Sequence, residues 1–214
     1  EAILKFRDAV KIDPKYVKAY SLWGAALVEL GKFEEAENRY EVALTLNPKD
    51  IDTYINWGIA LGKQGKNLIA ETKFRKALSI NPKSTYANFM LAMVLAETGR
   101  PEEAIERFKE VSRVQPQNTD VWHYWSMTLF RLNKIDEAIE KAKVALNLNP
   151  AKSDVYINMG DLLTHKESYD EAVECFKVAE KIEPNFYQIY LSWGITLYKK
   201  GDIDKTLEHV SRAI

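Results

Sequence analysis

The sequence predicts an all-α solenoid built from antiparallel helix pairs, and two regularities carry this prediction. Six of the seven prolines recur every 34 residues without slippage, at Pro14, Pro48, Pro82, Pro116, Pro150 and Pro184. Small and apolar residues keep the same register between these prolines. An unbroken period of this length indicates one supersecondary unit copied along the chain. We therefore expect function on the surface that the stacked copies build, rather than in a catalytic pocket.

The register becomes visible when each repeat is counted from the third residue after the preceding proline. The repeats then begin at Val17, Ile51, Thr85, Thr119, Ser153 and Tyr187. Position 8 is small in every repeat, namely Gly24, Gly58, Ala92, Ser126, Gly160 and Gly194. Position 11 is always leucine, and position 24 is aromatic in four repeats. Small residues let two helix backbones approach closely, and large ones fill the grooves beside them.

The unbroken period favours one continuous array over two separate domains. We expect a half repeat at residues 1–16, full repeats at 17–50, 51–84, 85–118, 119–152 and 153–186, and an incomplete repeat at 187–214. In such an array each repeat buries its apolar face only against its neighbours. Because the chain starts and stops within a repeat, we expect it to be a piece of a longer protein.

Within each repeat, local signals mark two helices and the turn between them. The first helix should end at a left-handed residue, for which glycine and asparagine are suited. The residues at this turn are Gly31, Gly65, Gly99, Asn133, Glu167 and Gly201. Glu167 departs from the pattern, so we expect a slightly strained turn there. Acidic pairs such as Glu34-Glu35 favour the start of the second helix, and the recurrent proline ends it.

This pattern resembles the tetratricopeptide repeat family over essentially the whole chain. The resemblance implies a right-handed superhelix whose first helices line a concave face. One departure is systematic, because position 7, usually leucine in the family, is tryptophan in four repeats. These residues are Trp23, Trp57, Trp125 and Trp193.

Composition and charge exclude several classes of function. The net charge is -1, and positive and negative residues are not arranged in stripes, so nucleic acid is an improbable partner. The chain contains no run of 18 apolar residues, so the sequence predicts no insertion into a membrane. The compartment is left open, with the cytoplasm slightly favoured. The single cysteine, Cys175, precludes a disulfide within the chain.

Residues with catalytic or metal-binding chemistry are few. Cys175 lies at position 23, where the next repeat has His209, but no second Cys/His pair completes a ligand set. His123 and His165 have no nucleophile or oriented base beside them in the pattern, and no Gly-rich phosphate loop occurs. We expect no catalytic residue, no cofactor, no metal site and no enzyme activity.

The family resemblance implies a partner-binding groove along positions 2, 5, 6, 9, 12 and 13 of the first helices. The candidate residues are Asn56, Ile59, Tyr86, Phe89, Met90, Met93, His123, Tyr124, Met127, Phe130, Arg131, Asn158 and Asp161. We expect Phe89 to divide its role between this groove and packing against the next repeat. Met90, Met93, Tyr124 and Met127 cluster on two consecutive first helices and should form an adaptable apolar strip.

Two specialised grooves of the family are disfavoured. The clamp for acidic C-terminal tails needs Lys, Asn and Arg at set positions, and only Asn56 matches. The asparagine ladder at position 6 that is found in sugar-transferase arrays is reduced here to Asn56 and Asn158. We therefore expect a scaffold that binds a protein or peptide partner. The alternatives are the regulatory region of a larger enzyme, such as a glycosyltransferase, and a homo-oligomer that assembles through exposed array ends.

Overall fold

A computed structural model describes residues 1–213, which form thirteen α-helices and no strand. The first helices of the repeats are α2 (Val17–Glu29), α4 (Ile51–Lys63), α6 (Thr85–Glu97), α8 (Thr119–Arg131), α10 (Ser153–His165) and α12 (Tyr187–Lys200). The second helices are α1 (Ala2–Ile12), α3 (Phe33–Leu46), α5 (Asn67–Ile80), α7 (Pro101–Val114), α9 (Ile135–Leu148), α11 (Tyr169–Ile182) and α13 (Ile203–Arg212). Every first helix begins at the residue that opens a repeat in the sequence. The predicted all-α solenoid fold is confirmed.

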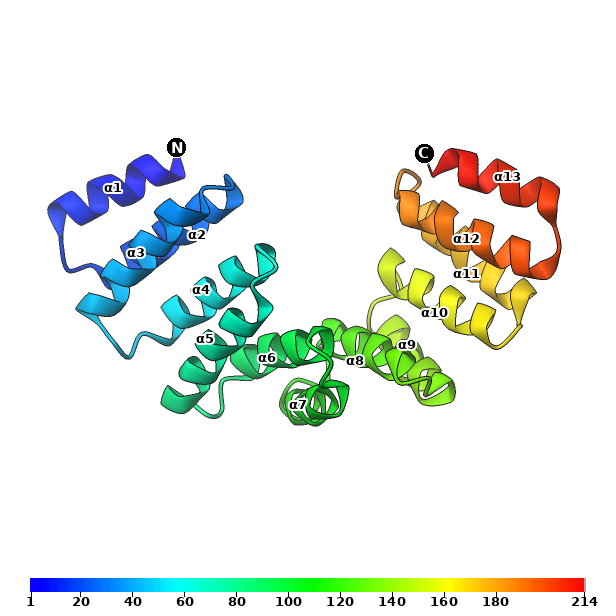
Figure 1. Ribbon diagram of the computed structural model, residues 1–214, viewed down its shortest axis with the longest axis horizontal. Coiled ribbons are helices and arrows are strands. Elements are labelled where there is room, and N and C mark those ends of the chain that lie inside the picture. The colour runs from blue at the N-terminus through cyan, green and yellow to red at the C-terminus, as the bar shows by residue number, and fades with distance from the viewer. Residues whose placement is uncertain (214) are drawn as a thin grey trace. The chain divides into compact units, whose positions relative to one another are not determined.

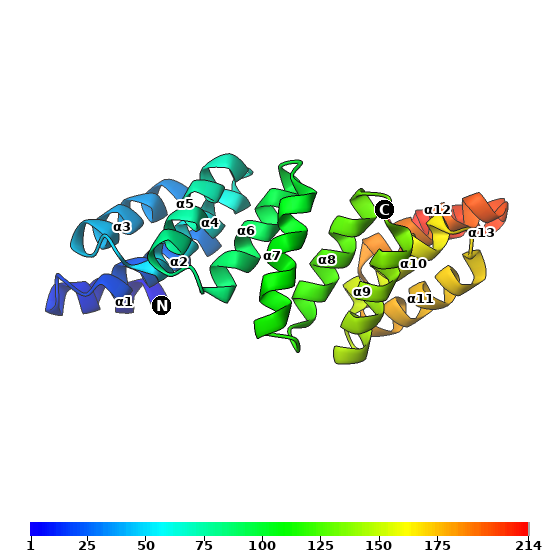
Figure 2. The ribbon, with the colours of Figure 1, turned by 90° about the horizontal axis from the view of Figure 1, so that it is seen from below.

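The helices fall into two compact units (Figures 1 and 2). The N-terminal unit, Glu1–Val114, contains α1 to α7, and the C-terminal unit begins at Gln115 and contains α8 to α13. Within each unit, the first helix of a repeat packs antiparallel to its second helix, and successive first helices lie side by side, as α2 and α4 do (Figure 1). The assignment of both units to one continuous array stays a prediction.

The turns between paired helices have the left-handed backbone that the sequence predicts. Gly31, Gly65, Gly99 and Gly201 have φ values between 71° and 90°. Asn133 has a φ of 58° and Glu167 a φ of 62°, so both adopt the same conformation despite their side chains. For Glu167 this conformation is unfavourable by roughly 1 kcal/mol, because its Cβ crowds the following carbonyl. The repeat geometry therefore overrides the preference of this residue.

The small residue at position 8 is required by the aromatic ring at position 24 of the same repeat. A Cβ added to Gly58 would lie 2.5 Å from the ring of Phe74, and one added to Gly160 would lie 2.5 Å from the ring of Phe176. Both rings are buried. The fourth repeat reverses this arrangement, with Ser126 at position 8 and Ala142 at position 24. Ser126 Oγ donates a hydrogen bond of 2.8 Å to the backbone oxygen of Ala138.

Two of the unusual tryptophans at position 7, Trp57 and Trp193, join neighbouring repeats. Trp57 stacks on Tyr40 of the preceding repeat, with ring centroids 6.1 Å apart, and Lys73 Nζ lies 3.3 Å from the Trp57 ring centroid. In the C-terminal unit, Trp193 stacks on Phe176, with His209 4.2 Å from its ring. Such sandwiches add cation–π or aromatic attraction to apolar burial. His209 therefore has a packing role.

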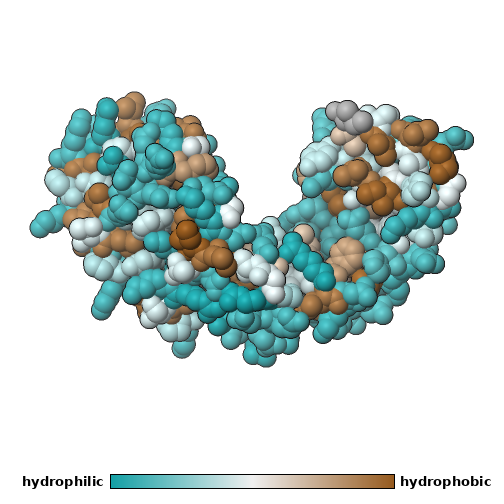
Figure 3. Space-filling model, in the orientation of Figure 1, coloured by the Kyte–Doolittle hydropathy of each residue, from teal (hydrophilic) through white to brown (hydrophobic). Residues whose placement is uncertain are grey.

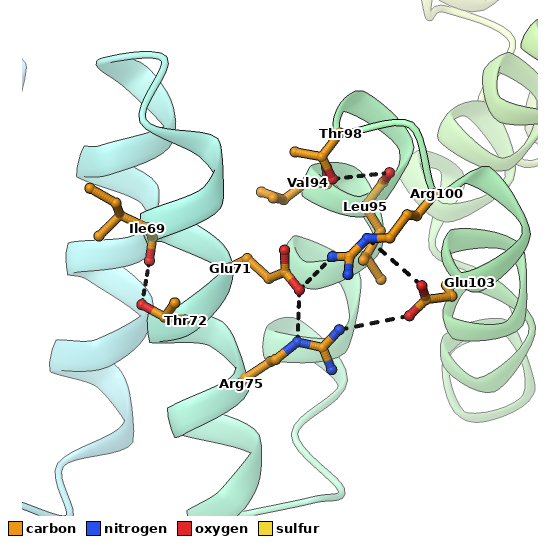
Figure 4. A network of polar contacts seen from close by, with 9 residues as sticks. All are labelled: Ile69, Glu71, Thr72, Arg75, Val94, Leu95, Thr98, Arg100 and Glu103. Carbon is orange, nitrogen blue, oxygen red and sulfur yellow. Dashed lines mark hydrogen bonds and ion pairs between the residues drawn. The ribbon is translucent and has the colours of Figure 1, made fainter.

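A buried ionic network joins the second and third repeats in the N-terminal unit (Figure 4). The Glu71 side chain, only 10% exposed, accepts a hydrogen bond of 2.8 Å from Arg75 Nε and a second from Arg100. Glu103 lies 3.7 Å from both arginines. The hydrogen bond from Arg100 is the largest cause that holds the pKa of Glu71 below its usual value. The network links α5 to the turn before α7.

None of the helices in residues 1–213 is both long enough and apolar enough to cross a membrane.

Candidate partner-binding site

A pocket of about 360 Å³ lies in the C-terminal unit between α8, α10 and the start of α12. Its lining comprises His123, Met127, Phe130, Arg131, Asp154, Ile157, Asn158, Asp161, Phe186, Gln188, Leu191 and Ser192. Six of these residues belong to the predicted groove: His123, Met127, Phe130, Arg131, Asn158 and Asp161. We call this the C-terminal pocket. It exists because positions 5, 9 and 12 of a first helix recur on one helical face.

The walls of the C-terminal pocket are largely apolar. Met127 and Phe130 from α8 are half-buried, whereas Leu191 on α12 is 43% exposed. Figure 3 shows apolar side chains gathered over α12, where Tyr187, Ile195 and Tyr198 are also exposed. Exposed apolar surface beside a pocket is characteristic of a binding site.

A chain of polar groups forms one side of this pocket. His123 Nε2 lies 3.8 Å from Asp154 Oδ2, and Lys152 Nζ lies 3.7 Å from the same oxygen. Lys152 also forms an ion pair with Asp120. Burial lowers the pKa of His123, although the charge of Asp154 opposes this effect. Burial therefore favours the neutral form of His123.

Asp161 contributes a partly buried carboxylate to the same pocket. Burial raises its pKa to about 6, although a hydrogen bond from Ser192 and the charge of Lys199 act in the opposite direction. The charged form of this side chain is thus poorly compensated at neutral pH. Asp154 and Asp161 are seven residues apart on α10, so they share one helical face two turns apart.

A smaller pocket of about 230 Å³ lies in the N-terminal unit between α2, α4 and α6. Its lining comprises Lys18, Ser21, Leu22, Asp50, Asp52, Ile55, Asn56 and Tyr86. Two predicted groove residues are among them, Asn56 and Tyr86, and Tyr86 is 51% exposed. We call this the N-terminal pocket. It shares repeat positions 2, 5, 6 and 34 with the C-terminal pocket, but it is smaller and has no lining residue from positions 9, 12 or 13.

The two position-6 asparagines bridge adjacent first helices. Asn56 Nδ2 donates to Ser21 Oγ at 3.1 Å, and Asn158 Nδ2 donates to Ser126 Oγ at 2.8 Å. Asn158 is 7% exposed, so its amide is used mainly inside the protein. The sequence identified these residues by their position, and the structure adds that each asparagine is hydrogen-bonded to a serine of the preceding repeat.

The remaining predicted residues line neither pocket: Ile59, Phe89, Met90, Met93 and Tyr124. Phe89 is 8% exposed and packs at a tilt against Phe108, with ring centroids 6.1 Å apart. Met90 and Met93 are half-buried on α6. Tyr124 lies edge-on to His123 at 5.4 Å. The apolar strip predicted from the third and fourth repeats contains residues of both compact units, and it stays a prediction.

Six residues of the C-terminal pocket are outside the list of candidate groove residues: Asp154, Ile157, Phe186, Gln188, Leu191 and Ser192. Phe186 occupies position 34 of the fifth repeat and Gln188 position 2 of the sixth. Position 34 was not considered, although Lys152 at the same place in the fourth repeat also reaches the pocket's acids. Phe186 and Lys152 lie at the junction between repeats, which a search restricted to first helices overlooks. Gln188 and Ser192 instead lie on the first helix α12, at positions 2 and 6.

Among the described residues, no group of three or more His, Cys, Asp or Glu side chains is placed to hold a metal ion. Burial is the main cause that raises the pKa of the Cys175 thiol to about 11. A thiol with such a pKa is a weak nucleophile at pH 7.

Comparison with known families identifies three matching stretches of the chain. A model described as TPR repeat matches residues 24–65, and two models described as tetratricopeptide repeat match residues 63–123 and 153–186. The comparison with curated proteins finds no sequence relative.

Solved structures with the same fold are numerous. The chain is similar to pilF of Pseudomonas aeruginosa, with a TM-score of 0.78 and 22% identity, covering 90% of this chain and 88% of that one. It is also similar to YrrB, described as a TPR protein with an unusual peptide-binding site, with a TM-score of 0.60 and 23% identity over 82% of this chain and 90% of that one. A chain of the APC/C hetero-tetramer Cut9-Hcn1 gives a TM-score of 0.87 at 15% identity, covering 99% of this chain and 42% of that one. At these identities the likeness concerns the fold. With its 34-residue helix pairs and the three matching stretches, the chain belongs to the tetratricopeptide repeat family.

Proposed function

We propose that this protein is an interaction module that binds a segment of a partner protein on the face formed by its first helices. The observation that carries the proposal is the C-terminal pocket, around which six residues selected by repeat register gather. A concave site with apolar walls and a few convergent polar groups is the usual form of a binding site. YrrB, which shares the fold, is described as having a peptide-binding site, and this description agrees with the proposal.

In this proposal the apolar anchors of the partner contact Met127, Phe130 and Leu191. The N-terminal pocket provides a second contact through Tyr86 and Asn56. The predicted residues outside both pockets, Ile59, Phe89, Met90, Met93 and Tyr124, would then extend the contact surface. The proposal gives none of these residues a catalytic role.

The experiment that tests this function selects binders from a random dodecapeptide library displayed on phage, with the immobilised chain as the target. Affinities of selected peptides are then measured by fluorescence anisotropy on wild type, Met127→Ala and Phe130→Ala. We expect each substitution to lower the affinity by roughly 1–3 kcal/mol, because central apolar contacts dominate binding. Helix content, measured by circular dichroism, should stay nearly constant.

Leu207→Ala is the matched control, because Leu207 is an exposed apolar residue (67%) on α13 that lines neither pocket. This control should bind the peptides as wild type does. If no peptide is enriched, or if Leu207→Ala weakens binding as much as the pocket variants do, the proposed function is wrong.

A further inference from the structure

Beyond the proposed function, we propose that one face of α1 binds an amphipathic helix of a partner protein. The partner helix carries a tryptophan, a small residue directly after it and a leucine four residues after the tryptophan. The face is formed by Ala2, Phe6 and Ala9, which lie in neither of the two pockets described above. We call it the α1 face. Interfaces that recur within the chain indicate both where such a helix would lie and which residues it would need.

The helix α1 packs against one first helix, whereas other second helices pack against two. Among the helices of residues 1–213, α1 contacts only α2. In contrast, α3 contacts both α2 and α4, and α5 contacts both α4 and α6. The helices α9 and α11 are flanked by two first helices in the same way. Figure 1 shows α1 at the edge of the N-terminal unit. One side of α1 is therefore open to a further helix.

The α1 face holds the residues that every complete repeat buries. Ala2, Phe6 and Ala9 occupy repeat positions 20, 24 and 27. In the five complete repeats, the residues at these three positions are at most 2% exposed. In α1, by contrast, Ala2 is exposed, Phe6 and Ala9 are half-buried, and the helix has no fully buried residue. A helix packed on the α1 face would remove this apolar surface from water.

The complete repeats specify a small residue in the helix that covers position 24. The ring at this position packs directly on the residue at position 8 of the first helix. A Cβ added to Gly24 would lie 2.6 Å from the ring of Tyr40. A helix that packs on Phe6 in the same way needs glycine or another small residue at the contact, because only then can the backbone approach the ring.

Lys5 specifies the aromatic neighbour of that small residue. It occupies position 23 and its side chain is 76% exposed, with only an exposed ion pair of 3.2 Å to Glu1. In three complete repeats the cation at position 23 lies over the position-7 tryptophan, at 4.3 Å for Arg39, 3.3 Å for Lys73 and 4.7 Å for Lys141. A tryptophan directly before the small residue would give Lys5 the same attraction.

A leucine completes the pattern, because position 11 is leucine in every repeat. Tryptophan, small residue and leucine are then at positions 7, 8 and 11, within one turn of the helix, as is usual for helices that dock through an apolar stripe. Four first helices of the chain itself contain this pattern, and each of them is already packed on its own second helix. We therefore assign the α1 face to a helix from another protein.

The test uses a fluorescein-labelled synthetic peptide with the sequence of residues 50–63, which comprises α4 and the Asp50 side chain that caps it. The peptide contains the Trp57-Gly58 pair and Leu61. We expect saturable binding to the wild-type chain, measured by fluorescence anisotropy. Phe6→Ala should weaken binding roughly tenfold or more, since a central aromatic contact is removed. The peptide with Gly58→Leu should bind wild type roughly tenfold or more weakly, because its side chain would meet the Phe6 ring.

Leu4→Ala is the matched control, because Leu4 is an apolar residue of the same helix that is 51% exposed. It occupies position 22, which is exposed in every other repeat. This variant should bind the peptide as wild type does. The inference is overturned if wild type does not bind the peptide, if Phe6→Ala binds it as wild type does, or if Leu4→Ala weakens binding as much as Phe6→Ala.

Two further measurements protect this test. If Phe6→Ala alters the helix content seen by circular dichroism, the two peptides on wild type still decide, and equal affinities refute the inference. Analytical ultracentrifugation of the chain without peptide examines the other occupant, a second copy. A dimer that Phe6→Ala dissociates would assign the α1 face to that copy and overturn the assignment to a partner protein.

Discussion

Two acids, the buried Glu71 in the N-terminal unit and the partly buried Asp161 in the C-terminal unit, have opposite surroundings. Glu71 in the N-terminal unit receives hydrogen bonds from Arg75 and Arg100, and its pKa is lowered. Asp161 in the C-terminal unit has only Ser192 and the charge of Lys199 to offset burial, and its pKa is raised to about 6. Glu71 is paired with cations of two repeats, whereas the charged form of Asp161 is poorly compensated.

The difference shows how one repeated framework serves two purposes. Glu71 is on a second helix, where one arginine comes from the same helix and the other from the turn between α6 and α7 of the next repeat. Asp161 is on a first helix, whose pocket-facing side is the surface available to partners. The two acids thus differ in the cations that the surrounding helices bring to them.

The largest expected effect comes from matched substitutions of position-11 leucines, Leu95→Ala in the N-terminal unit and Leu129→Ala in the C-terminal unit. Each leucine is 1% exposed, so each substitution should lower the free energy of unfolding by about 2–5 kcal/mol. Because repeats contact mainly their neighbours, each loss should appear first in its own unit. Hydrogen exchange measured by mass spectrometry would locate it. Uniform loss of protection across residues 1–213 after either substitution would show that the units unfold together.

Glu71→Gln should destabilise the protein by about 1–3 kcal/mol at pH 7, because two charge-assisted hydrogen bonds lose their charge. The pKa of Glu71 is lower in the folded state, so its contribution is present above the ordinary value of 4.5 and is lost as the pH falls through the folded pKa. Urea unfolding at pH 7 and at pH 3.5 would measure the difference. Equal stability of wild type and variant at pH 7 would show that the ionic network around Glu71 does not stabilise the folded protein.

Asp161→Asn should change the free energy of unfolding in the opposite direction from Glu71→Gln, and should stabilise the protein by about 1–2 kcal/mol at pH 8. The pKa of Asp161 in the folded state, about 6, exceeds the ordinary value of 3.8. Asp161 therefore stabilises the folded wild type fully below pH 3.8, and this contribution is lost as the pH rises through 6. The gain of the variant should therefore disappear at pH 3.8 and below. The same urea series on Asp136→Asn, which is exposed, is the control. If Asp161→Asn is less stable than wild type at pH 8, the charged form of Asp161 is well compensated and the contrast with Glu71 is wrong.

The smallest expected effect concerns the cations above the position-7 tryptophans. Lys73 Nζ lies 3.3 Å from the Trp57 ring centroid, whereas Lys141 Nζ lies 4.7 Å from that of Trp125. Lys73→Gln should lower stability by roughly 0.5–1 kcal/mol, and Lys141→Gln by less, because the attraction weakens with distance. Thermal melting of Lys73→Gln and Lys141→Gln at low and high salt would measure the two stability losses separately. A larger loss from Lys141→Gln would contradict this order.

Sequence alone determined the period, the helix starts and the sites of close packing. Proline spacing and the position-8 residues were sufficient because each repeat folds through contacts that recur every 34 residues. The left-handed turn was also predicted, including the departure at Glu167. Six of the residues around the C-terminal pocket followed from counting positions along first helices.

Only the tertiary structure decided which polar groups are compensated. The sequence gives no sign that Asn158 is paired with Ser126, or that His123 Nδ1 and Asp154 Oδ1 are buried without partners. Phe186 joined the pocket from the junction between repeats, which lies outside the first helices. The physical reason is that repeat register fixes where a side chain projects, whereas its charge state and its partners depend on atoms brought close from other helices.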